Sequence, residues 1–335
     1  MNNSQALNIV TMANDIGRTH PFTLRKAFEV YYNSISRHNQ NFTIHLYTNL
    51  PKHWFTRDKV KVYDSSEQDF LTLYKGNRWF NLTFHRFFLL EKHLLMGDNP
   101  TWIDLDTIIC DNIEFLADYP NMFIKYGFGE NVVTIDSQHA RPQKEWMHGH
   151  LFKIDQTIVG WIKEILAKGE DIPTYEIMSF FTLLEMQHPE HFNILNRITN
   201  KLINSQWCYD PYRVVEKPNS LTNQHFHEEP RLIKDRIQLI NGRLYGYDGP
   251  PQAGGKLCEF MIMTFTFFPL EANLRQNWST IIDPGAREWL RKICPVSVSD
   301  RLRFYLIHWR YSLRRDNLKK KPVLRPIIRM LQKIL

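Results

Sequence analysis

The sequence predicts an α/β fold: one domain whose mixed central sheet is flanked by helices, followed by a basic helical tail. Two observations predict it. Apolar runs of strand length alternate with helix-spaced apolar patterns in the first third of the chain, and an apolar strand there carries two aspartates. With 335 residues, 43% hydrophobic and 23% charged, the chain is long enough to bury a sizeable core.

The first elements form a strand–helix–strand–strand opening. Residues 8–12 are a short apolar run suited to a buried strand, and Asn14 begins the turn that follows. Residues 21–36 carry apolar side chains at helical spacing, residues 42–47 alternate as a strand does, and residues 60–63 form another short strand. This order is typical of the nucleotide-binding half of an α/β protein.

A helix and an apolar strand come next. Residues 79–96 place phenylalanines and leucines at helical spacing, and the Gly-Asp-Asn-Pro turn at 97–100 ends the helix. Residues 101–110, TWIDLDTIIC, predict one buried central strand that carries Asp104 and Asp106 near its end.

The pattern is weaker beyond Asp111. Residues 145–150 are aromatic and rich in histidine, and residues 173–187 predict a helix with proline in its first turn. Asn-Gly at 241–242 lies between apolar residues and predicts a hairpin over 237–247. Residues 260–268 predict a buried strand.

Composition argues against several classes of protein. The first residues lack the pattern of a secretory signal, and the longest mostly apolar stretch, 260–270, is short of the roughly 20 residues of a spanning helix. We therefore expect a cytoplasmic protein. No two cysteines have C-x-x-C spacing, which argues against zinc and fits a reducing compartment; the four are Cys110, Cys208, Cys258 and Cys294.

Asp104 and Asp106 are the residues with the clearest chemical meaning. Side chains at i and i+2 of a strand point the same way, and two carboxylates among apolar neighbours are costly to bury unpaired. A hard divalent cation, Mn²⁺ or Mg²⁺, would satisfy them and complete its shell with substrate phosphates. The alternative is a strand-to-loop turn in which the aspartates cap the next element. The apolar strand and the preceding elements favour the metal.

The stretch from His85 to Leu116 resembles the GT-A glycosyltransferases, especially bacterial relatives of family 8. Those proteins have an arginine-bearing helix, then a D-x-D strand, then a short apolar segment. The resemblance implies that Asp104 and Asp106 hold the metal of a nucleotide-sugar and that Arg86 lies near the nucleotide. It also implies that the first strand end, with Thr11 and Asn14, contacts the nucleoside.

The resemblance further implies a hexosyltransferase that moves a sugar from a nucleotide-sugar donor to a glycan or lipid-linked acceptor. Synthesis of lipopolysaccharide or another cell-surface polysaccharide is the expected role. We expect residues 1–118 to bind the donor and residues 119–300 to bind the acceptor, with 301–335 as a basic amphipathic tail.

Two of the family's features have no clear match. The first is the late Gly-x-x-Lys-Pro-Trp segment, which corresponds only poorly to residues 254–256. The second is the late metal-binding histidine, and each candidate is more typical of a surface or core histidine: His150, His225, His227 and His308.

The catalytic base stays unassigned. An inverting enzyme needs a carboxylate base near the acceptor hydroxyl, whereas a retaining enzyme need not show one. Each candidate is more typical of a structural carboxylate: Glu176, Glu185, Asp210 and Asp248.

Charge is concentrated in the tail. Residues 301–335 contain eleven lysines and arginines and one acid, Asp316, whereas the first 300 residues have a net charge of −3. Basic side chains interleaved with aromatic and aliphatic ones suit an anionic membrane surface, so we expect peripheral contact with the inner face of the membrane. Nucleic acid is not expected because no motif that reads it occurs elsewhere. A solvated tail without a partner is the other alternative.

Two other functions remain open. A phosphohydrolase of the haloacid dehalogenase type also carries D-x-D on an apolar strand, but it prefers threonine or valine two residues after the second aspartate, where this chain has Ile108. A non-catalytic membrane adaptor with a transferase-like fold is the second, because a fold does not fix a function.

Overall fold

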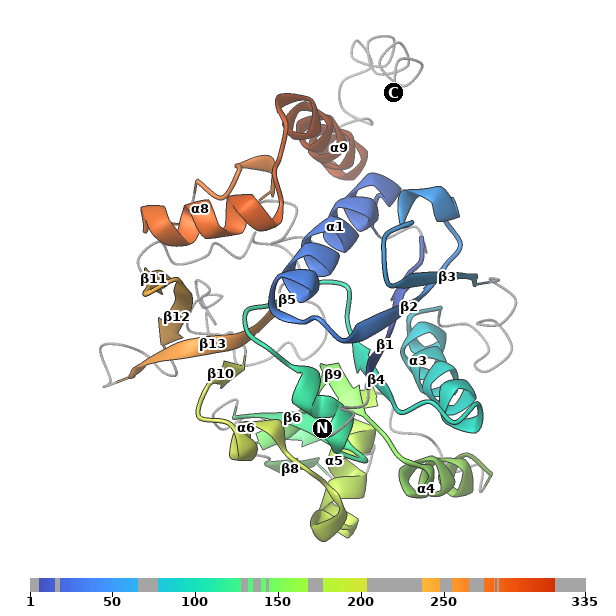
Figure 1. Cartoon of the computed structure of the whole chain (residues 1–335). Helices are drawn as coiled ribbons and strands as arrows, with labels where there is room; N and C mark the ends of the chain where they lie inside the picture. The colour runs from blue at the N-terminus through green and yellow to red at the C-terminus, as the bar shows by residue number, and fades with distance from the viewer. Residues whose placement is uncertain are drawn as a thin grey trace.

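A computed structural model of the chain confirms the α/β fold with a mixed central sheet (Figure 1). The structure describes residues 6–15, 19–65, 78–127, 132–134, 140–142, 145–167, 177–203, 237–247, 255–264, 274–279, 281 and 283–316.

The main sheet has six strands in the order β3-β2-β1-β4-β9-β6. The first four strands in this order run parallel, and β9 and β6 are each antiparallel to their neighbours. The bounds are β1 (Leu7–Ala13), β2 (Phe42–Thr48), β3 (Val60–Asp64), β4 (Pro100–Ile103), β6 (Met122–Gly127) and β9 (Glu145–Lys153). Since β4 pairs with β9, the predicted donor and acceptor halves share one sheet.

Alternating side chains divide the core into two layers. Ile9 packs with α1 (Pro21–His38) on one face of the sheet, and Val10 belongs to a cluster on the other face. Side chains from α3 (Arg78–Leu95), α4 (Gln156–Ala167) and α5 (Ile177–Gln187) cover that second face. Burial on both faces explains why the inner strand β4 is mostly apolar, whereas the edge strand β3 carries the exposed Lys61 and Asp64.

A second sheet lies beside the α1 face (Figure 1). Its central strand, β13 (Leu257–Thr264), pairs with β5 (Thr107–Ile109), with β10 (Leu202–Ile203) and with β12 (Arg243–Tyr247), and β12 pairs with β11 (Gln238–Ile240). The predicted hairpin is confirmed: Asn241 and Gly242 have φ of 51° and 80°, as its two-residue turn requires.

The prediction of one strand over residues 101–110 is wrong. The strand β4 ends at Ile103 in the main sheet, and β5 begins at Thr107 in the second sheet. Between them the chain turns, and the Thr107 amide donates to the Asp104 carbonyl at 3.2 Å. The apolar residues of this segment are all buried, but in two sheets, so the two aspartates lie at the junction of the sheets.

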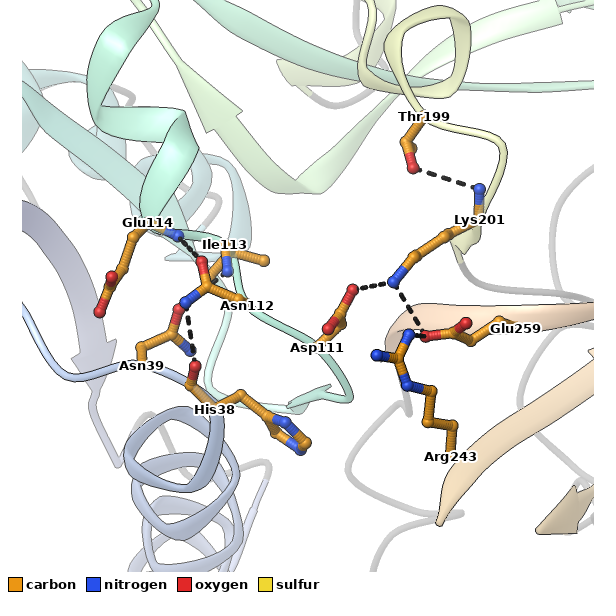
Figure 2. A network of polar contacts seen from close by, with 10 residues as sticks. All are labelled: His38, Asn39, Asp111, Asn112, Ile113, Glu114, Thr199, Lys201, Arg243 and Glu259. Carbon is orange, nitrogen blue, oxygen red and sulfur yellow. Dashed lines mark hydrogen bonds and ion pairs between the residues drawn. The ribbon is translucent and has the colours of Figure 1, made fainter. Parts of the chain in front are cut away.

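A polar network fixes the far end of β5 (Figure 2). The Lys201 ammonium bonds both Asp111 and Glu259, the latter at 2.9 Å, and Arg243 donates to Glu259 at 2.8 Å. On the other side, Asn112 donates to the carbonyl of His38 at 3.1 Å, at the end of α1. The segment that carries the aspartates is therefore anchored to α1 and to the second sheet.

The C-terminal helix α9 (Val298–Asp316) begins before the predicted tail and partly belongs to the body. Its Phe304 packs against Phe22 of α1 with ring centroids 5.1 Å apart, and Lys26 forms a 3.0 Å ion pair with Asp300. Residues 317–335 lie outside the described part. Among the helices that the structure describes, none is both long and apolar enough to span a bilayer.

The remaining elements are short or peripheral. Two of the longer helices, α4 and α8 (Pro284–Ile293), have no counterpart in the sequence predictions. The predicted helix 173–187 is described from Ile177 and the predicted strand 260–268 begins earlier, at Leu257. The others are η1 (Lys52–Trp54), η2 (Glu114–Asp118), η3 (Pro189–His191), α6 (Leu195–Ile198), β7 (Val132–Thr134) and β8 (Ala140–Pro142).

Candidate functional site

The candidate site lies at the carboxyl edge of the parallel strands. The strand order places β1 between β2 and β4, so the chain proceeds in opposite directions on the two sides of β1. Ligands of open α/β sheets bind beyond the carboxyl ends of the strands at such a switch point. Asp104 follows the last residue of β4, and Asn14 follows the last residue of β1, at the same edge.

Asp104 is held by three neighbours. One terminal nitrogen of Arg86, from α3, lies 3.0 Å from Oδ1 and 3.1 Å from Oδ2 of Asp104. The indole of Trp102 donates to Oδ1 at 2.7 Å, and the Arg86 guanidinium lies 5.4 Å from the centre of that indole ring. The Asp104 amide donates to the His150 carbonyl at 2.7 Å, which joins the turn to β9. These contacts fix the orientation of the Asp104 carboxylate.

His150 and Asp106 complete the cluster. His150 lies on β9, and the antiparallel register of β4 and β9 brings it opposite Asp104. Its Nδ1 is 3.0 Å from Oδ2 of Asp104 and 3.4 Å from Oδ1 of Asp106. One ligand atom from each of the three side chains lies within 4.8 Å of the other two. The arrangement therefore joins two carboxylates and one imidazole at one point.

The charges of the three groups are coupled. Burial raises the pKa of Asp106, and the attraction of His150 does not reverse this. Burial also opposes ionisation of Asp104, but Arg86 and His150 outweigh it and hold the pKa of Asp104 below its usual range. Burial lowers the pKa of His150, yet the charges of Asp106 and Asp104 raise it to about 10. The imidazolium therefore compensates part of the carboxylate charge.

These side chains fit a divalent cation. Two carboxylates supply the hard oxygen ligands that Mn²⁺ and Mg²⁺ prefer, and an imidazole is a common ligand of Mn²⁺. His150 would bind the cation as neutral imidazole, so binding would release its proton. Arg86 and Trp102 would not bind the cation themselves. Their hydrogen bonds would orient the Asp104 carboxylate that does.

Thr11 and Asn14 lie near this edge. The Thr11 side chain is fully buried in β1, and the Asn14 side chain is hydrogen-bonded to neighbouring strand ends. Asn14 donates to the Ser65 hydroxyl at 3.1 Å and accepts from the Asn49 amide at 3.0 Å, so it ties the ends of β1, β2 and β3 together. Their contact with a nucleotide stays a prediction.

The other candidate residues divide into two groups. Glu185 of α5 forms a 2.8 Å ion pair with Lys125 of β6, and His308 lies in α9. Outside the described residues are Glu176, Asp210, His225, His227 and Asp248.

Residue type alone makes His150 a candidate ligand but favours a structural role for it, and it predicts no role for Trp102. The histidine-rich stretch 145–150 was the available signal for His150, but only the pairing of β4 with β9 places this residue beside the aspartates.

No protein-family model matches the chain, and no curated protein matches it in sequence. Solved structures that are similar to it include mouse xyloside xylosyltransferase 1, with 14% identity, 57% of this chain and 85% of that chain covered, and a TM-score of 0.38. The galactosyltransferase LgtC has 14% identity, 60% and 74% coverage and a TM-score of 0.42. Glycosyltransferase GlyE of Streptococcus pneumoniae has 15% identity, 58% and 46% coverage and a TM-score of 0.36.

Proposed function

We propose that the chain is a metal-dependent glycosyltransferase that moves a sugar from a nucleotide-sugar donor to an acceptor. The observation that carries the proposal is the convergence of Asp104, Asp106 and His150 at the switch point of the sheet. A cluster of two carboxylates and an imidazole at this edge suits a cation that binds a diphosphate. Mn²⁺ or Mg²⁺ is the proposed ion.

Each residue has a part in this function. Asp104, Asp106 and His150 hold the cation, which when bound neutralises charge on the diphosphate leaving group. Arg86 and Trp102 keep Asp104 in one orientation through their bonds to its oxygens. Asn14 keeps the ends of three parallel strands in register beside the donor. The phosphohydrolase alternative needs an aspartate that is free to attack phosphorus, whereas both oxygens of Asp104 accept hydrogen bonds.

The donor can be identified by thermal unfolding with a panel of nucleoside diphosphates and nucleotide-sugars, each with and without Mn²⁺. A ligand at about 100 times its Kd adds about 2.7 kcal/mol to the free energy of unfolding, so a raised Tm with one nucleotide and only with cation is expected. A control series with EDTA separates metal-dependent from metal-independent binding. If no nucleotide raised the Tm under either condition, the proposal would be rejected.

We further propose a hexosyl donor and a glycan or lipid-linked acceptor, in cell-surface polysaccharide or lipopolysaccharide synthesis at the inner face of the membrane. Support for a membrane surface comes from α9. Three apolar side chains at helical spacing are exposed there: Val298 at 65%, Leu302 at 58% and Tyr305 at 54%. The basic residues of 301–335 would add attraction to anionic lipid.

Vesicle binding tests the membrane contact. The protein is expected to sediment with vesicles that contain anionic lipid and not with neutral ones, and high salt should release it because the attraction is partly electrostatic. Leu302→Glu should weaken binding because it places a negative charge on the exposed stripe. Equal binding to neutral and anionic vesicles, or no binding to either, would contradict the proposed membrane contact.

A further inference from the structure

A second cluster of metal-ligating side chains lies on the α3 face of the main sheet, apart from the site described above. His45 comes from β2, His93 from α3, and Asp98 from the turn that follows α3. His45 and His93 are 3% and 0% exposed. The cluster shares no residue with the sheet-edge site formed by Asp104, Asp106 and His150.

The sequence and fold bring these residues together in a simple way. His45 and Tyr47 are two residues apart on β2 and therefore point to the same face of the sheet. Tyr63 on β3 lies directly opposite Tyr47 in the parallel register, and their rings stack with centroids 4.9 Å apart. The last turn of α3 then places His93 over His45, with ring centroids 4.4 Å apart.

Polar atoms lie around both imidazole rings of the cluster. His93 Nδ1 lies 2.8 Å from Oδ2 of Asp98, and His93 Nε2 lies 3.1 Å from the Tyr47 hydroxyl. His45 Nδ1 lies 3.2 Å from the hydroxyl of Tyr63. One ligand atom from each of His45, His93 and Asp98 lies within 4.8 Å of the other two. This spacing fits a hydrogen-bonded network in the core, and it equally fits a preformed cation site.

The donor set points to a different ion from the one at the sheet edge. The sheet-edge site offers two carboxylates and one imidazole, whereas this cluster offers two imidazoles and one carboxylate. Nitrogen-rich sites favour zinc and related late first-row metals over Mn²⁺ and Mg²⁺. Ligand atoms around tetrahedral zinc are about 3.3 Å apart, so small side-chain rotations from the observed spacing would form three bonds.

We infer that His45, His93 and Asp98 form a zinc site, with a neighbouring tyrosine hydroxyl or a water molecule as the fourth ligand. The site contains no cysteine, so the absence of cysteine pairs in the sequence does not exclude it. A metal ion would enter from solvent at Asp98, because the Asp98 side chain is 33% exposed while the two histidines are buried.

Such a site has a structural purpose. His93 and Arg86 lie seven residues apart on α3, which is two helical turns, so they project from the same side of the helix. A metal that joins His93 to β2 would fix the helix that holds Arg86 against Asp104. The zinc site therefore supports the position of Arg86 without contacting the sheet-edge site.

Metal binding to the untagged full-length protein tests the inference. The background is the double variant Asp106→Asn with His150→Gln, which removes two of the three sheet-edge ligands and leaves the Arg86–Asp104 ion pair intact. After removal of metal with EDTA, one equivalent of Zn²⁺ is expected in competition with a chromophoric chelator. Co²⁺ should give the visible absorption of a tetrahedral site, which a six-coordinate surface complex would not give.

Single variants then locate the binding. In this background, His45→Gln and His93→Gln should each weaken zinc binding by more than the roughly 10–100-fold that loss of an outer-shell partner costs. His53→Gln is the matched control, because His53 is an exposed histidine on η1. Asp98→Asn, at the exposed rim, keeps the test valid if a buried variant fails to fold. Retention of full zinc affinity in Asp98→Asn and in a folded histidine variant would overturn the inference, as would absence of binding in the background protein.

Discussion

Asp106→Asn is expected to abolish the Mn²⁺-dependent stabilisation of the protein by its nucleotide. The substitution removes one of the two carboxylates and half of the negative charge that the cation requires, while keeping the size of the side chain. At a ligand concentration of about 100 Kd, the loss amounts to about 2.7 kcal/mol of free energy of unfolding. Thermal unfolding with and without Mn²⁺, together with donor hydrolysis, measures it.

The protein without ligand should tolerate Asp106→Asn. Asp106 is buried and burial raises its pKa, so a neutral amide relieves a cost of desolvation even as it loses the attraction of His150. Asp64→Asn is the matched control, since Asp64 has 81% of its side chain exposed and pairs with Lys52 at the surface. Full Mn²⁺-dependent binding in Asp106→Asn would remove this residue from the site.

Local sequence patterns were sufficient for β1, β2, β3, α1 and α3, but not for the break between β4 and β5. The parallel strands are short apolar runs, and helical spacing in α1 and α3 is regular, because each of these elements buries one or both faces in the core. The hairpin at Asn241 and Gly242 could be predicted because its signal lies within the turn itself. Pairing of β4 with β9 has no such signal, since about forty residues separate the two strands.

The candidate site could be predicted only in part, because some of its residues are brought together by long-range strand pairing. Asp104 and Asp106 are two residues apart in the sequence, so their spacing was visible, although a turn and not a continuous strand brings them together. His150 joins them through strand pairing, which residue types alone do not specify. For Arg86, the sequence indicated the right helix, but its contact with Asp104 depends on how α3 packs over β4.

Arg86→Met is expected to destabilise the protein by about 3–5 kcal/mol, the usual effect of removing one partner of a buried ion pair. The side chains of Arg86 and Asp104 are 12% and 14% exposed, so water replaces little of the lost interaction. Arg25→Met is the matched control: Arg25 is 40% exposed and lies 3.8 Å from Glu29, and such surface pairs contribute about 0–1 kcal/mol. Denaturant unfolding of the protein without nucleotide measures both variants.

The decrease in the free energy of unfolding caused by Arg86→Met should depend on pH in a defined direction. Because Arg86 and His150 hold the pKa of Asp104 below its usual range against the effect of burial, the pair stabilises the fold above the unfolded pKa of about 3.9. This contribution disappears as pH falls through the folded pKa. The stability difference between wild type and Arg86→Met should therefore be largest near neutral pH and shrink below about pH 4. A difference that stayed constant across this range would show that Arg86 acts through its packing on Trp102 and not through its charge.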